Sequence, residues 1–109
     1  MKLIFDEMPL KHLTNFYGGE KELRANMFAD GRNKILRGRL APGASIGYHC
    51  HETSSEVIYI LSGSGRMLTE SGEERLTAGD CHYCELGNSH SLINDGAEEL
   101  VFFAVVPQQ

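Results

Sequence analysis

The chain has 109 residues, of which 41% are hydrophobic and 23% are charged, values close to those of an ordinary globular domain. A chain of this length buries enough surface to form a core without disulfides or metal staples, so we expect one domain. Ten lysines and arginines stand against fifteen aspartates and glutamates, for a formal net charge of -5. Because no segment gathers the basic residues needed to neutralise a run of phosphates, nucleic acid is excluded as the expected partner.

The first residues contain neither a targeting signal nor a membrane segment. The apolar run at residues 3–5 is ended by two acidic residues, far short of a signal-peptide core. No part of the chain approaches the roughly 18 to 20 consecutive apolar residues that a membrane span needs. Three cysteines without an export signal, Cys50, Cys81 and Cys84, indicate reduced thiols. We therefore expect a cytoplasmic protein that does not contact membranes.

Residues 1–34 carry the least regular pattern of the chain. Residues 20–29 contain good helix formers, yet their small and apolar side chains recur at every second position, which is strand spacing. These side chains belong to Leu23, Ala25, Met27 and Ala29. We interpret this part as an extra strand within an N-terminal extension, residues 1–34, that packs on the rest of the chain or on a dimer partner.

Residues 35–109 have the pattern of an all-β barrel. Short runs rich in β-branched and aromatic residues alternate with turns in which glycine and asparagine recur. The expected strands are residues 35–40, 46–51, 56–61, 66–70, 74–77, 81–84, 90–93 and 100–106. Their number is that of a jelly roll, which has eight strands.

Two of these runs, residues 57–61 and 100–106, are apolar without alternation. Such a pattern predicts strands that are covered on both faces. A two-layer barrel of this size has no spare helix to cover the outer face. A second copy of the chain is the expected cover, so we predict a homodimer.

Residues 43–63 contain a histidine and glutamate pattern of the form G-x5-H-x-H-x4-E-x6-G. His49 and His51 are two apart on one expected strand, so both imidazoles leave the same face of the pleat. Glu56 heads the returning strand, where its carboxylate can reach the same point, and His90 is a fourth candidate at the start of a later strand. Such a cluster costs several kcal/mol to desolvate unless it coordinates a metal, and we therefore predict a metal site.

Two motifs with ordered spacing resemble the cupin superfamily, in particular its small bacterial members. The pattern over residues 43–63 matches the first cupin motif at every fixed position. Residues 79–94 follow the second motif, G-x5-P-x-G-x2-H-x3-N, with His90 at the histidine position. Glu85 stands where the family usually has proline, which would stiffen the chain before the turn. This difference puts the rigidity of the loop in question, but not the ligand.

The resemblance implies a double-stranded β-helix, the cupin jelly-roll barrel, over residues 35–109. It also implies one divalent metal ion near one mouth of the barrel, bound by His49, His51, Glu56 and His90. Three imidazoles and one carboxylate suit Mn, Fe, Co, Ni or Zn in the divalent state. Four protein ligands around an ion that prefers six leave about two positions for water, substrate or dioxygen.

The run Cys81-His82-Tyr83-Cys84 has the C-x-x-C spacing of a redox or zinc motif, but a strand excludes that chemistry. Residues three apart on a strand point to opposite faces and lie too far apart for a disulfide. Alternation directs either Cys81 and Tyr83 or His82 and Cys84 into the barrel. In the second case His82 is a candidate catalytic proton carrier beside the metal.

The sequence therefore supports two functional hypotheses. The first is a metal-dependent enzyme that acts on a small polar organic molecule; the resemblance implies a dioxygenase, decarboxylase or isomerase. The alternative is a module that binds or senses a small molecule without converting it. A closed structural metal site ranks below both, because the mixed ligand set is expected to leave open positions. In both leading hypotheses the partner is a small-molecule ligand.

Overall fold

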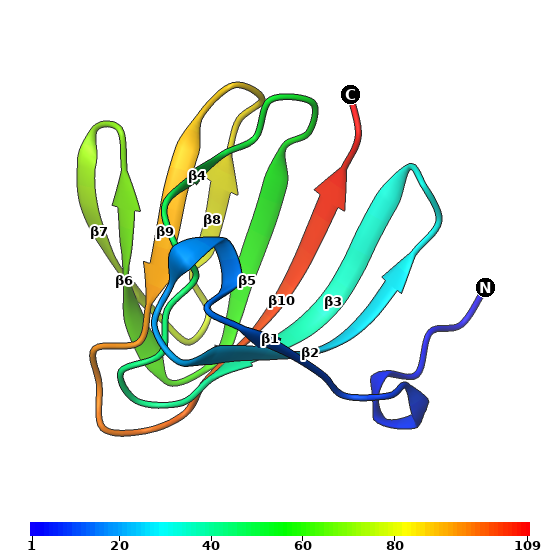
Figure 1. Ribbon diagram of the computed structural model, residues 1–109, viewed down its shortest axis with the longest axis horizontal. Helices are drawn as coiled ribbons and strands as arrows, with labels where there is room; N and C mark the ends of the chain where they lie inside the picture. Colours follow the sequence, from blue (N-terminus) through cyan, green and yellow to red (C-terminus); the bar gives the residue numbers. More distant parts are fainter.

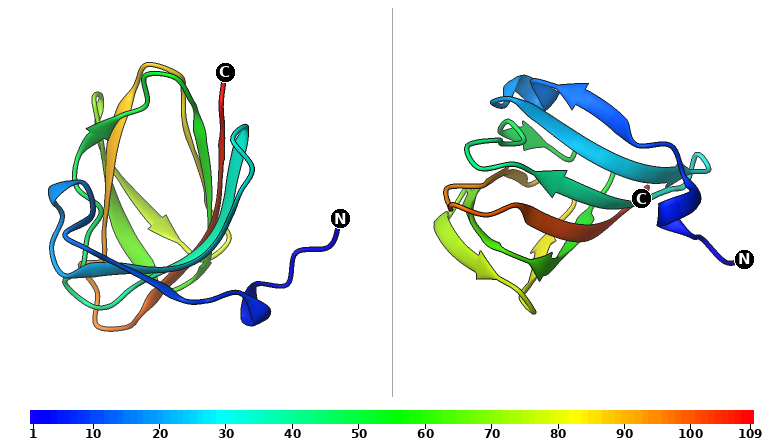
Figure 2. Two further views of the ribbon diagram at one scale, coloured as in Figure 1. Left: turned by 45° about the vertical axis from the view of Figure 1, so that its right-hand side comes forward. Right: turned by 90° about the horizontal axis from the view of Figure 1, so that it is seen from below.

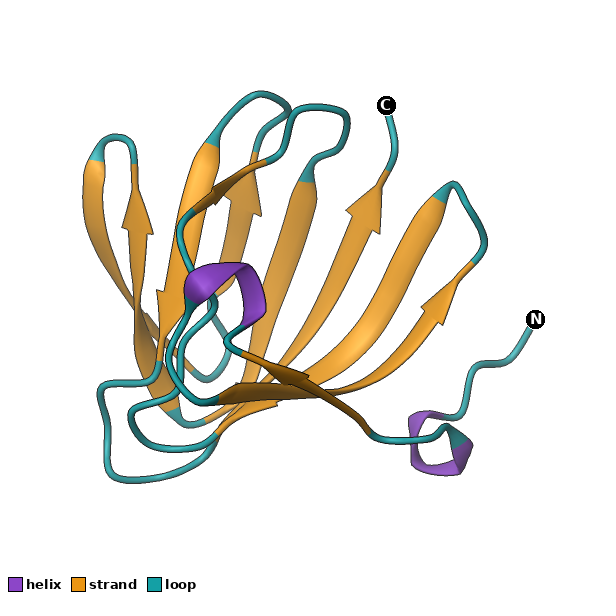
Figure 3. Cartoon of the chain, in the orientation of Figure 1, coloured by secondary structure: helices purple, strands orange, loops and turns teal.

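Ten strands arranged in two antiparallel sheets account for most of the computed structural model, which describes residues 1–109 (Figure 1). The strands are β1 (Lys11–Thr14), β2 (Glu22–Ala29), β3 (Asn33–Leu40), β4 (His49–Cys50), β5 (Glu56–Ser62), β6 (Ser64–Thr69), β7 (Gly72–Thr77), β8 (Cys81–Cys84), β9 (Ser89–Ile93) and β10 (Leu100–Pro107). Two single-turn 3-10 helices, η1 (Phe5–Glu7) and η2 (Phe16–Gly18), lie in the N-terminal part (Figure 3). None of the helices has the length and apolarity that a membrane crossing requires.

The two sheets face each other and enclose the interior of a barrel (Figure 2). The larger sheet has the strand order β1-β2-β3-β10-β5-β8, and the smaller one has the order β4-β9-β6-β7. The last strand, β10, is hydrogen-bonded between β3 and β5, so strands far apart in the sequence become neighbours. This arrangement confirms the predicted all-β jelly-roll fold.

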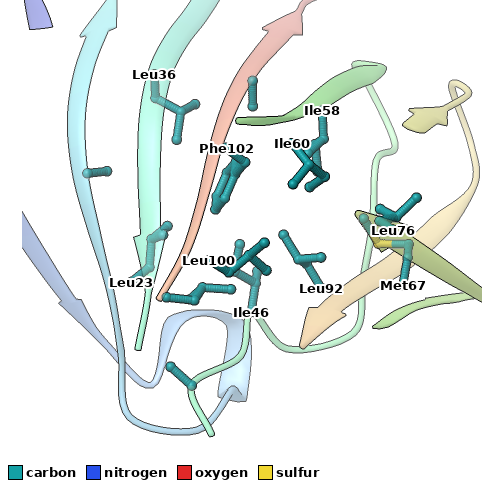
Figure 4. Close-up of a cluster of buried hydrophobic side chains, with 14 residues drawn as sticks. Leu23, Leu36, Ile46, Ile58, Ile60, Met67, Leu76, Leu92, Leu100 and Phe102 are labelled. Carbon is teal, nitrogen blue, oxygen red and sulfur yellow. The ribbon is translucent and has the colours of Figure 1, made fainter. Parts of the chain in front are cut away.

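Both sheets turn apolar side chains inward and form a core of 14 buried residues (Figure 4). Burial alternates along β10, where Leu100, Phe102 and Ala104 are at most 1% exposed while their neighbours are partly exposed. Gly38 on β3 lies directly against the Phe102 ring, because a Cβ on Gly38 would lie only 2.3 Å from that ring. The core therefore depends on period-two alternation and on one glycine that lets an aromatic ring lie against the sheet.

The predicted extra strand in residues 20–29 is confirmed as β2, which pairs with β3 and carries the buried Leu23 and Ala25. Two strand predictions need correction. Strand β1 was not anticipated, because its four residues carry no clear alternation. The expected strand at 46–51 is reduced to β4, which has two residues. Just before β4, the backbone N–H of Gly47 donates to the Phe16 carbonyl, at 2.9 Å, in place of a ladder hydrogen bond.

The outer face of the larger sheet carries apolar side chains that one chain leaves open. Tyr59 and Leu61 on β5 are 42% and 47% exposed, so this strand alternates in burial although its sequence does not. On β10, the outward Phe103 packs edge-on against Phe5 of η1, with ring centroids 6.2 Å apart. The N-terminal segment thus covers part of β10, while β5 keeps a face of the kind that a second copy is expected to cover.

Candidate metal centre

Three imidazoles and one carboxylate converge inside the barrel. Nε2 of His51 lies 3.2 Å from Nε2 of His49 and 3.0 Å from Nε2 of His90. One carboxylate oxygen of Glu56 lies 3.1 Å from His51 Nε2 and 2.9 Å from His90 Nε2. One ligand atom from each of the four residues lies within 4.8 Å of every other, and this set is the one that the sequence motifs predict.

Strand pairing between β4 and β9 brings these side chains together. His49 lies directly opposite His90 in the antiparallel ladder, so both side chains leave the same face. His51 follows two residues later, and its backbone pairs with the turn before β9. Its N–H donates to the Asn88 carbonyl at 3.0 Å, and its carbonyl accepts from the Gly87 N–H at 2.7 Å. The glycine turn of the second motif thus holds the end of the first motif.

The donor set and its spacing fit a metal ion. Glu56, His51 and His90 are 8%, 8% and 2% exposed, and no lysine or arginine is paired with the carboxylate. Ligands at right angles and about 2.1 Å from a common ion lie about 3.0 Å from each other, which agrees with the contacts of 2.9 to 3.2 Å. Buried imidazole nitrogens that face each other at this distance are what a divalent transition metal binds. The cluster is therefore able to hold such an ion.

The remaining ring nitrogens orient two of the imidazoles. His49 Nδ1 donates to the Gly47 carbonyl at 2.7 Å, which leaves the Nε2 lone pair free to face the cluster. His51 Nδ1 contacts the Ser54 hydroxyl at 2.9 Å, within the turn between β4 and β5. Hydrogen bonds on the nitrogen opposite the metal are typical of histidine ligands, since they fix the tautomer and the ring orientation.

The protonation states of the site match those of metal ligands. Burial alone would raise the pKa of Glu56, but hydrogen bonds from His51 and His90 outweigh burial and lower this pKa to about 2. Burial lowers the pKa of His49 and outweighs its hydrogen bond to the Gly47 carbonyl. At neutral pH the carboxylate is therefore ionised and His49 is neutral, the forms in which both groups ligate a metal.

A small cavity of about 60 Å³ lies beside the cluster. Eight of its twelve lining residues are hydrophobic: Phe16, Tyr17, Leu23, Met27, Leu36, Ile46, Phe102 and Val106. The other four are Lys34 and three members of the cluster, His49, His51 and Glu56. The cluster therefore forms one polar wall of an otherwise largely apolar pocket, which is the usual form of a small-molecule site.

The orientation of β8, which the sequence leaves open, is decided in the structure. His82 and Cys84 are 5% and 3% exposed and point inward, while Cys81 and Tyr83 point outward. All three cysteines of the chain are free. Burial raises the pKa of Cys84 to about 11, so its thiol is protonated at neutral pH and does not compete as a thiolate ligand.

The predicted catalytic candidate His82 lies behind His90. Its Nε2 is 3.1 Å from His90 Nδ1, the ring nitrogen that faces away from the cluster, and its Nδ1 is 2.9 Å from a Glu74 carboxylate oxygen. Burial lowers the pKa of His82 and outweighs the hydrogen bond to Glu74. His82 does not line the cavity, so the geometry connects it to a ligand and not to a bound molecule.

Sequence reasoning missed two residues that line the cavity. The Tyr17 ring stacks on the His49 imidazole with centroids 4.0 Å apart and planes 8° apart. Gly47 permits this approach, since a Cβ there would lie 1.9 Å from the Tyr17 carbonyl oxygen. Lys34 reaches the cavity from the start of β3. Neither residue belongs to a motif. The turn-forming residues around Tyr17 indicate a loop, but they do not indicate a contact with the site.

Comparisons with known proteins agree with this geometry. The sequence pattern of the family described as Cupin domain matches residues 36–106. An oxalate-binding protein of Thermotoga maritima is 34% identical over 106 residues, which cover 92% of this chain and 88% of that protein. The β-alanine degradation protein BauB of Pseudomonas aeruginosa is 35% identical over 70 residues, which cover 62% of this chain and 74% of that protein. The crystal structure of a predicted oxalate decarboxylase from Thermotoga maritima superposes with a TM-score of 0.93 at 30% identity, covering 100% of both chains.

The fold and the cluster together define a β-barrel with a histidine and carboxylate site that can hold a metal ion. The chain belongs to the cupin family, as the two sequence motifs predict. The match runs from within β3 to within β10, and it includes all four residues of the cluster.

Proposed function

We propose that the protein is a metal-dependent cupin that acts on a small carboxylic acid. The metal is a divalent Mn, Fe, Co, Ni or Zn ion held by His49, His51, Glu56 and His90. The observation that carries the proposal is the convergence of three imidazole nitrogens and one carboxylate oxygen on one wall of a small apolar cavity. A divalent metal bound there supplies Lewis-acid chemistry, polarising an oxygen of the bound molecule.

The chain's own residues favour a small anion as the bound molecule. The cavity is small, so it suits a compound of few atoms. Lys34 is a cation that lines the cavity of a protein whose net charge is -5, and it supplies a partner for a carboxylate. The names of the relatives, an oxalate-binding protein and a predicted oxalate decarboxylase, support a carboxylic acid of the same class.

A module that binds a small acid without converting it is the second candidate. It is favoured by the composition of the cavity wall, where Tyr17 and Lys34 are the only groups able to transfer a proton that do not belong to the cluster. An enzyme would have to draw its proton from one of these two groups or from water. The name of the oxalate-binding relative also supports this candidate.

Incubation of the Mn, Fe, Co, Ni and Zn forms with oxalate and with a panel of small carboxylates, diketones and sugars separates the two candidates. Decarboxylation of oxalate breaks the carbon–carbon bond and replaces carbon dioxide by a proton, so formate and carbon dioxide are the products to assay. We expect binding in calorimetry and product formation with at least one metal, both lost in Glu56→Gln. A ligand that binds tightly and returns unchanged in every metal form would favour the binding module. Absence of any binding would contradict both candidates.

We also propose that the protein is a homodimer through the outer face of β5. Light scattering at micromolar concentration is expected to give about 24 kDa, twice the mass of 12.1 kDa for one chain. Leu61→Glu places a charge on that face and is expected to shift the mass toward the monomer. Leu86→Glu is the matched control, because Leu86 is also 47% exposed but lies on a loop. A monomeric wild-type protein would show that the exposed face stays in contact with water.

A further inference from the structure

We propose that Glu74 and His82 are positioning residues that set the tautomer of His90 and direct its Nε2 lone pair toward the metal. This inference deepens the proposed function and rests on it, since it takes His90 as a ligand. The three side chains form one hydrogen-bonded chain, from the Glu74 carboxylate through both nitrogens of His82 to Nδ1 of His90.

The direction of the hydrogen bonds follows from the carboxylate at one end. An ionised carboxylate only accepts, so His82 Nδ1 carries the proton and donates to Glu74 over 2.9 Å. The Nε2 of the neutral His82 then has a lone pair and accepts from His90 Nδ1 over 3.1 Å. With its proton on Nδ1, His90 presents its Nε2 lone pair to a metal ion; in the metal-free site Glu56 opposes this tautomer, because its carboxylate lies 2.9 Å from the same nitrogen and accepts from an Nε2–H.

Burial of the hydrogen-bonded network explains why it holds His90 firmly. His82 and His90 are 5% and 2% exposed, so water does not replace either contact. The Glu74 side chain is 49% exposed, and the chain therefore ends at the surface. Loss of His82 leaves His90 Nδ1 without a partner, and loss of Glu74 leaves His82 Nδ1 without one, and buried polar groups seldom remain unpaired.

The hydrogen-bonded network of Glu74, His82 and His90 also joins the two sheets behind the metal site. Glu74 lies on β7 and His90 on β9, both in the smaller sheet, whereas His82 lies on β8 at the edge of the larger sheet. The other two imidazoles differ in this respect, since the Nδ1 partners of His49 and His51 lie two and three residues away in the sequence. His90 is therefore the ligand whose orientation depends on a side-chain network from other strands.

The first measurement is made on metal-free, 15N-labelled protein, so it does not depend on metal binding. Two-bond 1H–15N correlation spectra at pH 7.5 distinguish the two neutral tautomers of each histidine. We expect more of the Nδ1–H form of His90 in the wild type than in His82→Phe and Glu74→Leu, because these variants weaken the pull on Nδ1 and leave Glu56 to direct the proton to Nε2. Glu74→Gln keeps an acceptor oxygen and is expected to restore the wild-type tautomer. Glu73→Leu is the matched control on the same strand, because Glu73 pairs with Arg66 instead.

The second measurement is the affinity for Zn(II), by competition with a chelator, with the Co(II) visible spectrum as a report on ligand geometry. Partners of a histidine ligand's second nitrogen are typically worth about 10- to 100-fold in metal affinity, which is the loss we expect in His82→Phe and Glu74→Leu. Circular dichroism checks the fold, and the exposed position of Glu74 keeps the test available if His82→Phe does not fold. An unchanged His90 tautomer ratio in both variants, or an unchanged metal affinity in both, would overturn the inference while leaving the proposed function intact. The expected tautomers without metal binding by the wild type would instead overturn the proposed function.

Discussion

His51→Ala is expected to abolish stoichiometric metal binding. The wild type is expected to carry close to one divalent transition metal ion per chain. His51 lies at the centre of the cluster, because its Nε2 contacts the ligand atoms of His49, His90 and Glu56 at 3.0 to 3.2 Å. Loss of a residue that is only hydrogen-bonded to a metal ligand lowers the metal affinity about 10- to 100-fold. Loss of the ligand itself should therefore lower the affinity by more than about 100-fold. Elemental analysis of protein purified in parallel measures the occupancy.

His12→Ala is the control for this experiment. His12 is exposed and pairs with Glu22, the first residue of β2, and it does not belong to the cluster, so its removal should leave the metal content unchanged. The melting temperature of the wild type should fall on chelation and that of His51→Ala should not, because only the wild type gains stability from the metal by mass action. Equal metal loss in both variants, or a wild type that takes up no metal under any reconstitution, would contradict the site.

Phe102→Ala is expected to lower the free energy of unfolding by about 3–5 kcal/mol, the usual cost of removing a buried aromatic ring. Phe102, the third residue of β10, is 1% exposed; its ring lies against Gly38 and lines the cavity. The backbone at Gly38 cannot move into the space left by the ring without disturbing the pairing of β3 with β10. Urea unfolding of metal-free protein, followed by circular dichroism, measures the loss.

Phe103→Ala is the matched control, because Phe103 is the next residue on β10 and its ring points to the outer face, against Phe5. It is half-buried, so the loss should be clearly smaller than for Phe102. A loss below about 1 kcal/mol for Phe102→Ala, which is the size of a typical point mutation, would show that the ring is not part of the tightly packed core.

Most strands of the barrel could be predicted from local sequence patterns, namely apolar and β-branched runs separated by turns. Strand β1 and the short length of β4 could not be predicted in this way. The run at residues 100–106 became β10, since β-branched and aromatic side chains form a strand in almost any barrel. The predicted strand at residues 46–51 is longer than the observed β4, which has two residues. The reason is that Gly47 donates to the Phe16 carbonyl in the N-terminal segment, a contact between residues about thirty positions apart that no local pattern indicates. The exposed Tyr59 lies on the outer face of β5, for which the apolar run predicts a second copy of the chain as the cover.

The sequence by itself determined the four residues of the candidate metal centre. His49 and His51 are two apart in an extended segment and Glu56 follows across a short turn, so their spacing predicts a common point, and the second motif adds His90. Only the tertiary structure decided that His82 points inward, because an alternating strand has two equivalent phases until packing selects one. In the barrel, His82 lies opposite Ile58, which is 1% exposed, and cross-strand neighbours share a face. The tertiary structure likewise brought Tyr17 to the site, since its contact with His49 depends on how the N-terminal segment docks and not on any local pattern.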